Sequence, residues 1–556
     1  MDNYTIADNF SLLAKLMDIH GENSFKTKSY SSASFAIEKL PVQLASLPED
    51  KIFSIKGVGE AIGKKIIEQI QTGRLPLLDS YLEKTPAGIL EMLAIKGIGP
   101  KKIAVIWKEL EVESPGELLY ACEENRLMLY KGFGQKTQQN IKEAIEFYLN
   151  NQGSFLYTQV EQYASEATEK MSNAFKDYSF RLTGDFERHL ETIDKLEWVT
   201  DAPSDLLTVF FIANDYKLVD SSADTTSYRG KENLLMTFYH TNKNNFVKTI
   251  FEKTSSPQFF EAWTSLFPLK DCYSREEDIF REANIEFIPA FLRESATIIE
   301  HAKQKKLPTV ITNQDITSVI HSHSKWSDGV NSIEEMATAA IKKGLQYLVL
   351  SDHSKSAFYA NGLTEERLIE QHKEIDELNK RLGPFKIFKS IESDILNDGS
   401  LDYNTDVLQN FDLVIASVHS NLKMKEDKAM ARLLKAIENP YTNILGHPTG
   451  RLLLSRNGYP IDHKTIIDAC AAHNVVIELN AHPKRLDLDW RWIGYCIDKN
   501  VLISIDPDAH SIDGFNDIRY GVIAAQKAGV TKSHNLSSFS LAGFENFLKT
   551  QHAKRR

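Results

Sequence analysis

The feature that most constrains this fold is a series of seven short apolar runs between about residue 317 and residue 510. Each run ends in a polar or metal-binding side chain; they read SVIHSH, YLVLSDH, FKIFKSIESD, LVIASVH, NILGHP, VVIELN and VLISIDPDAH. Helical patterns separate the runs, and the first begins with a capping box at Ser332 and Glu335 and stops at Gly344. Strands that alternate with helices predict a parallel sheet. About seven such strands favour a barrel, whose functional residues gather at the carboxyl ends of the strands.

The polar ends of these runs supply nine nitrogen and oxygen ligands and no cysteine: His321, His323, Asp328, His353, Glu392, His419, His447, Asp508 and His510. Side chains at i and i+2 of a strand point to the same face of the sheet. The pair His321 and His323 and the pair Asp508 and His510 can therefore each clamp one ion. A single histidine on an apolar run is more often a packed core residue, but nine at strand ends favour a cluster of two or three ions. Imidazole with carboxylate suits zinc, manganese or iron. Such clusters serve phosphoester hydrolysis.

The motifs HSHSKWSDG, SDHSKS, SIESDIL, ASVHSN, GHPTGR and SIDPDAH, in that order, resemble the polymerase-and-histidinol-phosphatase (PHP) domain that ends bacterial family X DNA polymerases. All nine ligand positions of that family are filled, and Ser390 stands where glycine is usual. The resemblance implies a distorted (βα)7 barrel over residues 316–556. It also implies 3′ to 5′ exonuclease activity, with abasic-site endonuclease or 3′-phosphatase activity as close relatives. Arg451, four residues after His447, is the candidate that neutralises charge on a phosphate.

The N-terminal region, to about residue 149, has a helical pattern and an internal repeat: SIKGVGEAIGKKI, AIKGIGPKKIAVI and LYKGFGQKTQQNI. Two glycines in each copy allow a tight hairpin whose amides, with the next helix start, form an anion site. The unit resembles the helix-hairpin-helix motif, which holds the DNA backbone without reading sequence. A packing role alone stays open for any one copy. The predicted DNA-binding residues are Gly57, Gly59, Gly97, Gly99, Lys101, Gly132 and Gly134, with further flanking lysines at 56, 64, 65, 96, 102, 131 and 136.

Residues 1–80 resemble the lyase domain of family X polymerases, and residues 81–150 form a second, fingers-like helix-hairpin-helix region. The resemblance places the Schiff-base lysine on Lys65, with Lys26 and Tyr30 on phosphate-contacting positions. Phe25 and Ala61 depart from the family pattern. A desolvated amine can act as a nucleophile, and the alternative for Lys65 is an ordinary surface lysine.

Residues 151–294 mix strand and helix patterns, and the clearest strand-like pieces are FRLTGDFERHLETIDKLEWVTD and DLLTVFFIAND. By order and length, this region resembles the family's palm and thumb, an α+β nucleotidyltransferase-like fold. The stretch that follows, residues 295–315, reads as a polar linker.

The chemistry of the palm is missing. A Gly-Asp pair that ends at Asp185 replaces the Gly-Ser pair that holds a triphosphate, and the metal-binding aspartates fall on Lys195, Glu197 and, on a later strand, near Thr237. Phosphoryl transfer depends on metal positioning, and a charged lysine cannot ligate magnesium. We therefore expect nucleotide addition to be lost, unless Asp194, Glu191 or Asp185 builds a shifted site.

Length and charge limit the remaining alternatives. The 556 residues predict three or four domains, and the net charge of −11 argues for local rather than global DNA contacts. Four scattered cysteines, and the lack of a signal peptide or a long apolar stretch, predict a cytoplasmic protein with no membrane contact.

The resulting hypothesis is a DNA-repair phosphodiesterase with two or three divalent ions, manganese or zinc with iron as an alternative. The competing hypotheses are an active repair polymerase with a PHP exonuclease, a small-molecule phosphatase of the histidinol-phosphatase type, and a non-catalytic DNA-binding scaffold. The hairpin repeats argue against the phosphatase. The nine ligands exceed what one closed structural site needs, which argues against the scaffold.

Overall fold

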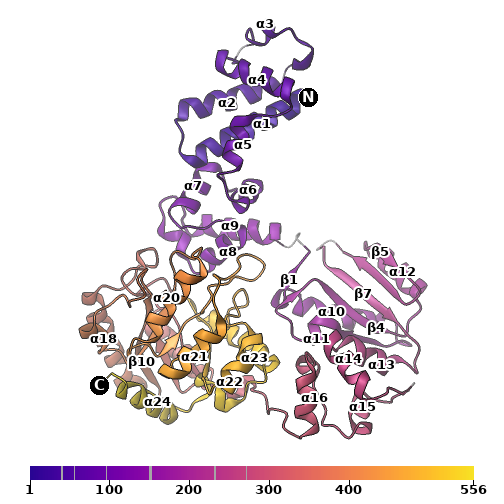
Figure 1. Cartoon of the computed structure of the whole chain (residues 1–556), viewed down its shortest axis with the longest axis vertical. Coiled ribbons are helices and arrows are strands. Elements are labelled where there is room, and N and C mark those ends of the chain that lie inside the picture. The colour runs from indigo at the N-terminus through magenta and orange to yellow at the C-terminus, as the bar shows by residue number, and fades with distance from the viewer. Residues whose placement is uncertain are drawn as a thin grey trace. The chain divides into compact units, whose positions relative to one another are not determined.

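A computed structural model describes residues 1–38, 40, 42–55, 57–95, 97–149, 153–230, 233–270 and 272–555. The chain divides into two compact units, Met1–Leu149 and Asn150–Arg556 (Figure 1). Among the helices in these described ranges, none combines the length and apolarity that a membrane crossing requires.

The first unit is helical, as predicted. Its α-helices are α1 Asn3–His20, α2 Ser24–Glu38, α3 Glu49–Ile52, α4 Glu60–Thr72, α5 Pro76–Leu82, α6 Ala87–Ala94, α7 Pro100–Lys108, α8 Pro115–Glu123 and α9 Gln135–Leu149. Helix α1 begins at Asp2, whose side chain accepts a hydrogen bond from the amide of Thr5, and ends at the left-handed Gly21. One apolar core runs from Ile6 on α1 to Ile145 on α9.

The three hairpins of the repeat share one backbone conformation. Their first glycines, Gly57, Gly97 and Gly132, have φ values of 94°, 95° and 95°, which L side chains rarely adopt. Helices α4, α7 and α9 begin directly after the second glycines. Around the second and third hairpins, no described atom lies within 4 Å of a Cβ built on any of the four glycines, so these turns have open space on that side. The flanking lysines 56 and 96 lie outside the described residues.

The second unit starts with a mixed five-stranded sheet in the order β2-β4-β7-β6-β5, in which only β4 and β7 are parallel. The elements are β1 Phe155–Leu156, α10 Tyr157–Ala174, β2 Phe180–Thr183, α11 Gly184–Glu187, β3 Thr192–Ile193, β4 Lys195–Thr200, α12 Ser204–Ala213, β5 Lys217–Ser221, β6 Thr225–Arg229 and β7 Leu235–His240. Trp198 stacks on Phe238 in its core, with ring centroids 5.3 Å apart.

The prediction of a strand at DLLTVFFIAND was wrong, because this segment forms helix α12. Leu207 and Phe211, four residues apart, face the core, whereas Val209 and Ile212 are 71% and 56% exposed. Because exposed positions of this helix are also apolar, the sequence shows a continuous apolar run and not the helical alternation of apolar and polar residues. A continuous apolar run of this kind cannot be told from a buried strand by periodicity alone.

Helices follow the sheet: α13 Phe246–Lys253, α14 Pro257–Leu266, α15 Glu276–Glu282 and α16 Ala296–Lys303. An aromatic cluster around the buried Arg293 holds them together. The segment expected to be a linker contains α16, whose Ile299 and Ala302 are buried in this cluster.

The remainder is a seven-stranded parallel sheet in the order β14-β13-β12-β11-β10-β9-β8. Its strands are β8 Ser318–Val319, β9 Tyr347–Leu350, β10 Lys386–Asp394, β11 Leu413–Ser417, β12 Ile444–Leu445, β13 Val476–Asn480 and β14 Ile503–Asp506. All seven predicted runs are therefore strands. A parallel bridge between Ser322 and Ala509, just beyond β8 and β14, joins the first strand to the last, so the barrel is nearly closed.

Helices surround this barrel: α17 Ile333–Lys342, α18 Glu365–Leu382, α19 Thr405–Leu408, α20 Glu426–Ile437, α21 His463–His473, α22 Trp490–Asp498, α23 Ile518–Lys527 and α24 Leu541–Ala553. The predicted capping box of Ser332 and Glu335 starts α17. Phe544 and Leu548 of α24 pack with the inner strand residues Tyr347 and Phe388.

Candidate metal centre

The parallel strands bring all nine predicted ligands to one rim of the barrel. Glu392 lies within β10, and the others lie in the segments that follow the strands. The Ser322–Ala509 bridge places the two i, i+2 pairs beside each other: the amide of His323 donates to the carbonyl of Ala509 over 2.9 Å, and the amide of Ala509 donates to the carbonyl of His321 over 3.3 Å. Residues about 190 positions apart in the sequence therefore flank one site.

The described residues include four overlapping groups whose ligand atoms all lie within 4.8 Å of one another, and every group is in this barrel. Together the groups contain all nine predicted ligands: His323, Asp328, His353 and His510; His321, His323 and Asp508; His321, Glu392 and His447; His353, Glu392 and His419. Because several residues belong to two groups, the arrangement suits adjacent ions that share ligands rather than isolated sites.

Glu392 is at the middle of this cluster. Five imidazoles approach its carboxylate: His353, His419 and His447 with a nitrogen at 3.0 Å, then His321 at 3.3 Å and His323 at 3.7 Å. Its side chain is 1% exposed. A fully buried carboxylate among so many nitrogen donors is a suitable bridging ligand for two cations.

Several ligand atoms have no hydrogen-bond partner within the part of the chain that the structure describes, although each is shielded from solvent. They are His321 Nε2, His323 Nδ1, Asp328 Oδ2 and His447 Nδ1. Buried polar atoms of proteins are nearly always hydrogen-bonded, so ligand atoms without such partners point to a bound species. Nitrogen and carboxylate oxygen donors of this kind fit divalent manganese, zinc or iron.

Charge in the cluster favours cations. Burial opposes the charged form of Glu392, but His419, His321 and His353 outweigh it and hold the pKa of the carboxyl well below its usual range. Burial likewise lowers the pKa of His419, yet Glu392 and Asp394 raise it to about 10. The carboxylate of Glu392 is therefore ionised at neutral pH, and an ion that binds at His419 displaces the proton of that imidazole.

Three of the predicted ligands have a positive φ: His321 at 60°, Asp508 at 51° and His447 at 20°. This left-handed region is costly for residues other than glycine, and such strain persists where the surroundings impose it, often at functional sites. His321 and Asp508 are the residues next to the Ser322–Ala509 bridge.

Two acidic residues that the sequence patterns did not single out orient the imidazoles. Glu478 Oε2 accepts a hydrogen bond from His321 Nδ1 over 2.6 Å, and Asp394 Oδ1 accepts one from His419 Nδ1. A carboxylate on Nδ1 leaves Nε2 as the atom available to a metal. A signal existed in the sequence, since Asp394 lies two positions after Glu392 in the same apolar run and Glu478 also lies within a run.

Replacing Glu478 by glutamine should weaken metal binding about 10- to 100-fold, because an uncharged partner makes His321 a poorer donor. Competition with a fluorescent chelator measures the affinity. Glu545→Gln, on the exposed side of α24, is the matched control and should leave affinity unchanged. Equal affinities for all three proteins would contradict the orienting role of Glu478.

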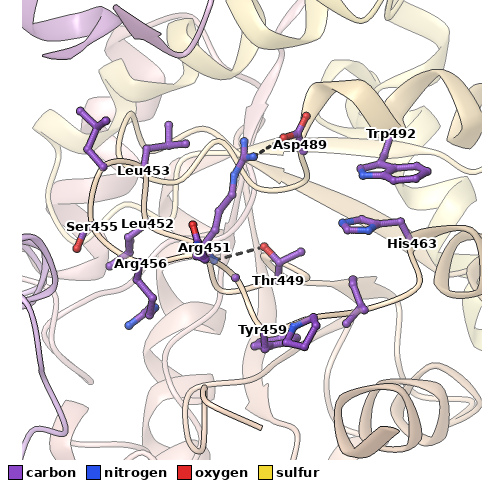
Figure 2. Close-up of a pocket in the computed structure, with 15 residues that line it drawn as sticks. Thr449, Arg451, Leu452, Leu453, Ser455, Arg456, Tyr459, His463, Asp489 and Trp492 are labelled. Atoms are coloured by element: carbon purple, nitrogen blue, oxygen red, sulfur yellow. Dashed lines mark hydrogen bonds and ion pairs between the residues drawn. The ribbon is translucent and has the colours of Figure 1, made fainter. Parts of the chain in front are cut away.

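Arg451, the predicted phosphate neutraliser, lies in the loop after His447 and lines a cavity of about 640 Å³ (Figure 2). Its guanidinium donates to Asp489 Oδ2 over 2.5 Å, to the carbonyl of Arg485 over 3.0 Å and to the carbonyl of Leu486. These contacts hold the loop, and the role of Arg451 toward phosphate stays a prediction.

The palm positions predicted to be altered also lie together. Lys195 Nζ is 2.7 Å from Glu197 Oε1, which accepts a hydrogen bond from the hydroxyl of Tyr239 over 2.5 Å. Glu197 pairs in register with Thr237 on the adjacent parallel strand. A Cβ on Gly184 would lie 1.9 Å from Glu197 Oε2. An ammonium group thus already neutralises the carboxylate at this place.

The carboxylates that could have built a shifted site have other partners. Asp185 pairs with Arg188 at 2.5 Å, Asp194 accepts a hydrogen bond from Ser154 over 2.6 Å, and Glu191 accepts one from Arg491 of α22 over 2.6 Å. Within the described ranges, no group of three metal-binding side chains forms in the palm.

The predicted DNA-binding and lyase residues lie in the first unit. Lys101 is exposed in the first turn of α7, whereas Lys65 is half-buried on α4. Tyr30 is 5% exposed and stacks on Phe10, and Phe25 is 80% exposed. The roles of these residues toward DNA stay predictions.

The geometry defines a class of protein: helix-hairpin-helix units in one chain with a parallel barrel that carries a cluster of nine candidate metal ligands. Three protein-family models match the helical region and the barrel. A helix-hairpin-helix domain matches residues 1–75, a SAM-like helix-hairpin-helix tandem matches 89–146, and a PHP domain matches 320–482.

The DNA polymerase/3′-5′ exonuclease PolX of Bacillus subtilis (strain 168) is 33% identical over 564 residues, which cover 97% of each chain. Probable phosphatases of Thermoanaerobacter sp. (strain X514) and Caldicellulosiruptor bescii are 30% and 27% identical, over 29% and 34% of this chain and 62% and 78% of theirs. The chain belongs to the bacterial family X DNA polymerases that carry a PHP domain.

Proposed function

We propose that this protein is a metal-dependent DNA phosphodiesterase that removes nucleotides from 3′ ends during DNA repair. The observation that carries the proposal is the buried nine-ligand cluster around Glu392 in a chain that also has three helix-hairpin-helix turns. The PolX relative of Bacillus subtilis, which spans almost the whole chain, is named for a 3′-5′ exonuclease activity.

The cluster would hold two or three divalent ions, manganese or zinc, with iron as an alternative. When bound, such ions supply the positive charge that activates water and stabilises the leaving oxygen in phosphoester hydrolysis. The protein's own contribution is orientation, because Glu478 and Asp394 fix the tautomers of His321 and His419. The hairpin amides and Lys101 would contact the DNA backbone without sequence preference.

Polymerase activity is, in this proposal, lost. Two metal ions normally neutralise the triphosphate in nucleotide addition, but the Lys195 ammonium stands 2.7 Å from Glu197 in their place. The positive charge of Lys195 opposes the binding of a metal cation at Glu197. The same ammonium cannot coordinate the attacking oxygen.

A labelled primer-template incubated with manganese, with and without nucleotides, tests both statements. We expect shortening from the 3′ end and no extension. Asp508→Asn combined with His510→Ala should reduce shortening on the order of 1,000-fold, because it removes ligands from two of the four groups. Shortening that persists in this double variant would contradict the barrel assignment.

A second candidate is a phosphatase, since the barrel matches relatives named probable phosphatases. Histidinol phosphate, DNA with a 3′-phosphate end and DNA with an abasic site, offered to the same preparation, separate the candidates. Cleavage of the small phosphomonoester with intact primer-template would favour the phosphatase. Incision at the abasic site alone would favour an endonuclease.

A further inference from the structure

A row of alternating charges connects the palm to the barrel loop that follows a metal ligand. It runs from Glu191 through Arg491 and Asp489 to Arg451. Arg491 Nη1 is 2.6 Å from Glu191 Oε1 and 3.0 Å from Asp489 Oδ1, and Arg451 Nη1 is 2.5 Å from Asp489 Oδ2.

On the palm side, Glu191 belongs to the segment that carries the altered polymerase positions. Its side chain is 11% exposed and accepts two hydrogen bonds from α22, from Arg491 and, over 3.1 Å, from Trp490 Nε1. The carbonyl of Glu191 accepts from the amide of Tyr157. The backbone of Glu191 is therefore held by the palm, and its side chain is held by the barrel.

On the barrel side, Asp489 caps α22 by accepting from the amide of Arg491 over 2.9 Å. Burial raises the pKa of its carboxyl, but Arg451 and Arg491 outweigh burial and lower it. Arg451 in turn binds the carbonyls of Arg485 and Leu486. Figure 2 shows its side chain reaching across the cavity wall toward Asp489.

The loop that Arg451 anchors, residues 446–459, begins directly after β12 and contains His447. A second contact holds its start, because the amide of Thr449 donates to Asp487 Oδ2 over 3.0 Å. The loop also lines the 640 Å³ cavity. Arg451 therefore anchors the same loop that carries His447, four residues away in the chain.

We propose that Glu191 is a positioning residue for loop 446–459, so that the palm supports the nuclease site. The inference rests on the proposed nuclease function. Without the Glu191 charge, Arg491 keeps Asp489 as its only acidic partner in this row and competes with Arg451 for it. The hold of Asp489 on Arg451 then loosens, and the loop becomes more mobile.

The test compares Glu191→Gln with Glu161→Gln in the full-length protein. Glu161 of α10 pairs with Arg519 of α23, so it is a palm–barrel ion pair of the same kind outside the row. Hydrogen exchange followed by mass spectrometry should show residues 446–459 exchanging about threefold faster or more in Glu191→Gln, and unchanged in Glu161→Gln. On the primer-template, Glu191→Gln should lower kcat/KM about three- to tenfold.

Two further variants separate positioning from general destabilisation. Arg491→Lys keeps a cation between the two carboxylates and should retain most activity, whereas Arg491→Met should behave like Glu191→Gln. In an Arg451→Met background, Glu191→Gln should change kcat/KM less than about 1.5-fold, because the row is already broken.

Equal exchange rates in all variants, or equal effects of Glu191→Gln and Glu161→Gln, would overturn the inference. A wild-type protein that leaves DNA intact would contradict the proposed nuclease function instead, and the exchange measurement would still decide the role of Glu191.

Discussion

Replacing Glu392 by glutamine should remove most of the bound metal and nearly all DNA hydrolysis. Five imidazoles surround this carboxylate within 3.7 Å, so the loss of its charge removes the attraction that keeps cations among them. We expect the metal content to fall to one ion or fewer, and the rate of shortening to fall on the order of 1,000-fold or more. Elemental analysis and a labelled primer-template measure the two effects.

Glu370→Gln is the control for this variant, because Glu370 is an exposed glutamate on α18 of the same barrel. It should retain wild-type metal content and activity. A Glu392→Gln protein that keeps both its ions and its activity would show that the nine side chains do not form one functional cluster.

Introducing carboxylates in the palm should create a metal site on strands β4 and β7. We expect the parent protein to bind no manganese in the palm, because Lys195 neutralises Glu197. Lys195→Asp combined with Thr237→Asp would place three carboxylates on the paired strands β4 and β7, since Glu197 and Thr237 are in register. Manganese binding by this variant should increase by one ion at millimolar metal.

The measurement needs the Asp508→Asn, His510→Ala background, in which the barrel contributes little binding. Calorimetry or electron paramagnetic resonance then counts the ions. Lys170→Asp, on α10 of the same domain, controls for the exchange of a lysine for an aspartate. Extension of a primer by the parent protein would contradict the proposed loss of polymerase activity.

The fold of the predicted palm does not depend on the polar positions that we expect to be altered. Its core depends on apolar contacts such as the stack of Trp198 on Phe238, which involve neither Lys195 nor Glu197. Asp185, Asp194 and Glu191 have partners inside the chain. The proposed loss of polymerase chemistry would therefore leave the domain folded, and in our inference Glu191 supports the neighbouring barrel.

Patterns that arise between near neighbours in the chain can be read from the amino-acid sequence alone. The capping box at Ser332 marked the start of α17, and His321 and His323, two residues apart, share one ligand group as predicted. The same spacing did not bring Asp508 and His510 into one group. The repeated glycines likewise predicted three hairpins of one conformation. Each of these depends on backbone geometry within a few residues, which the local sequence controls.

Contacts between residues that lie hundreds of positions apart could be identified only in the folded chain. The segment of α12 was misread as a strand because only its neighbours show which of its apolar residues are covered. Glu478 reaches His321, and Glu191 reaches Arg491, across 157 and 300 positions. Such partners are selected by the packing of barrel and palm, and the polarity of a side chain alone does not reveal which distant charge it will meet.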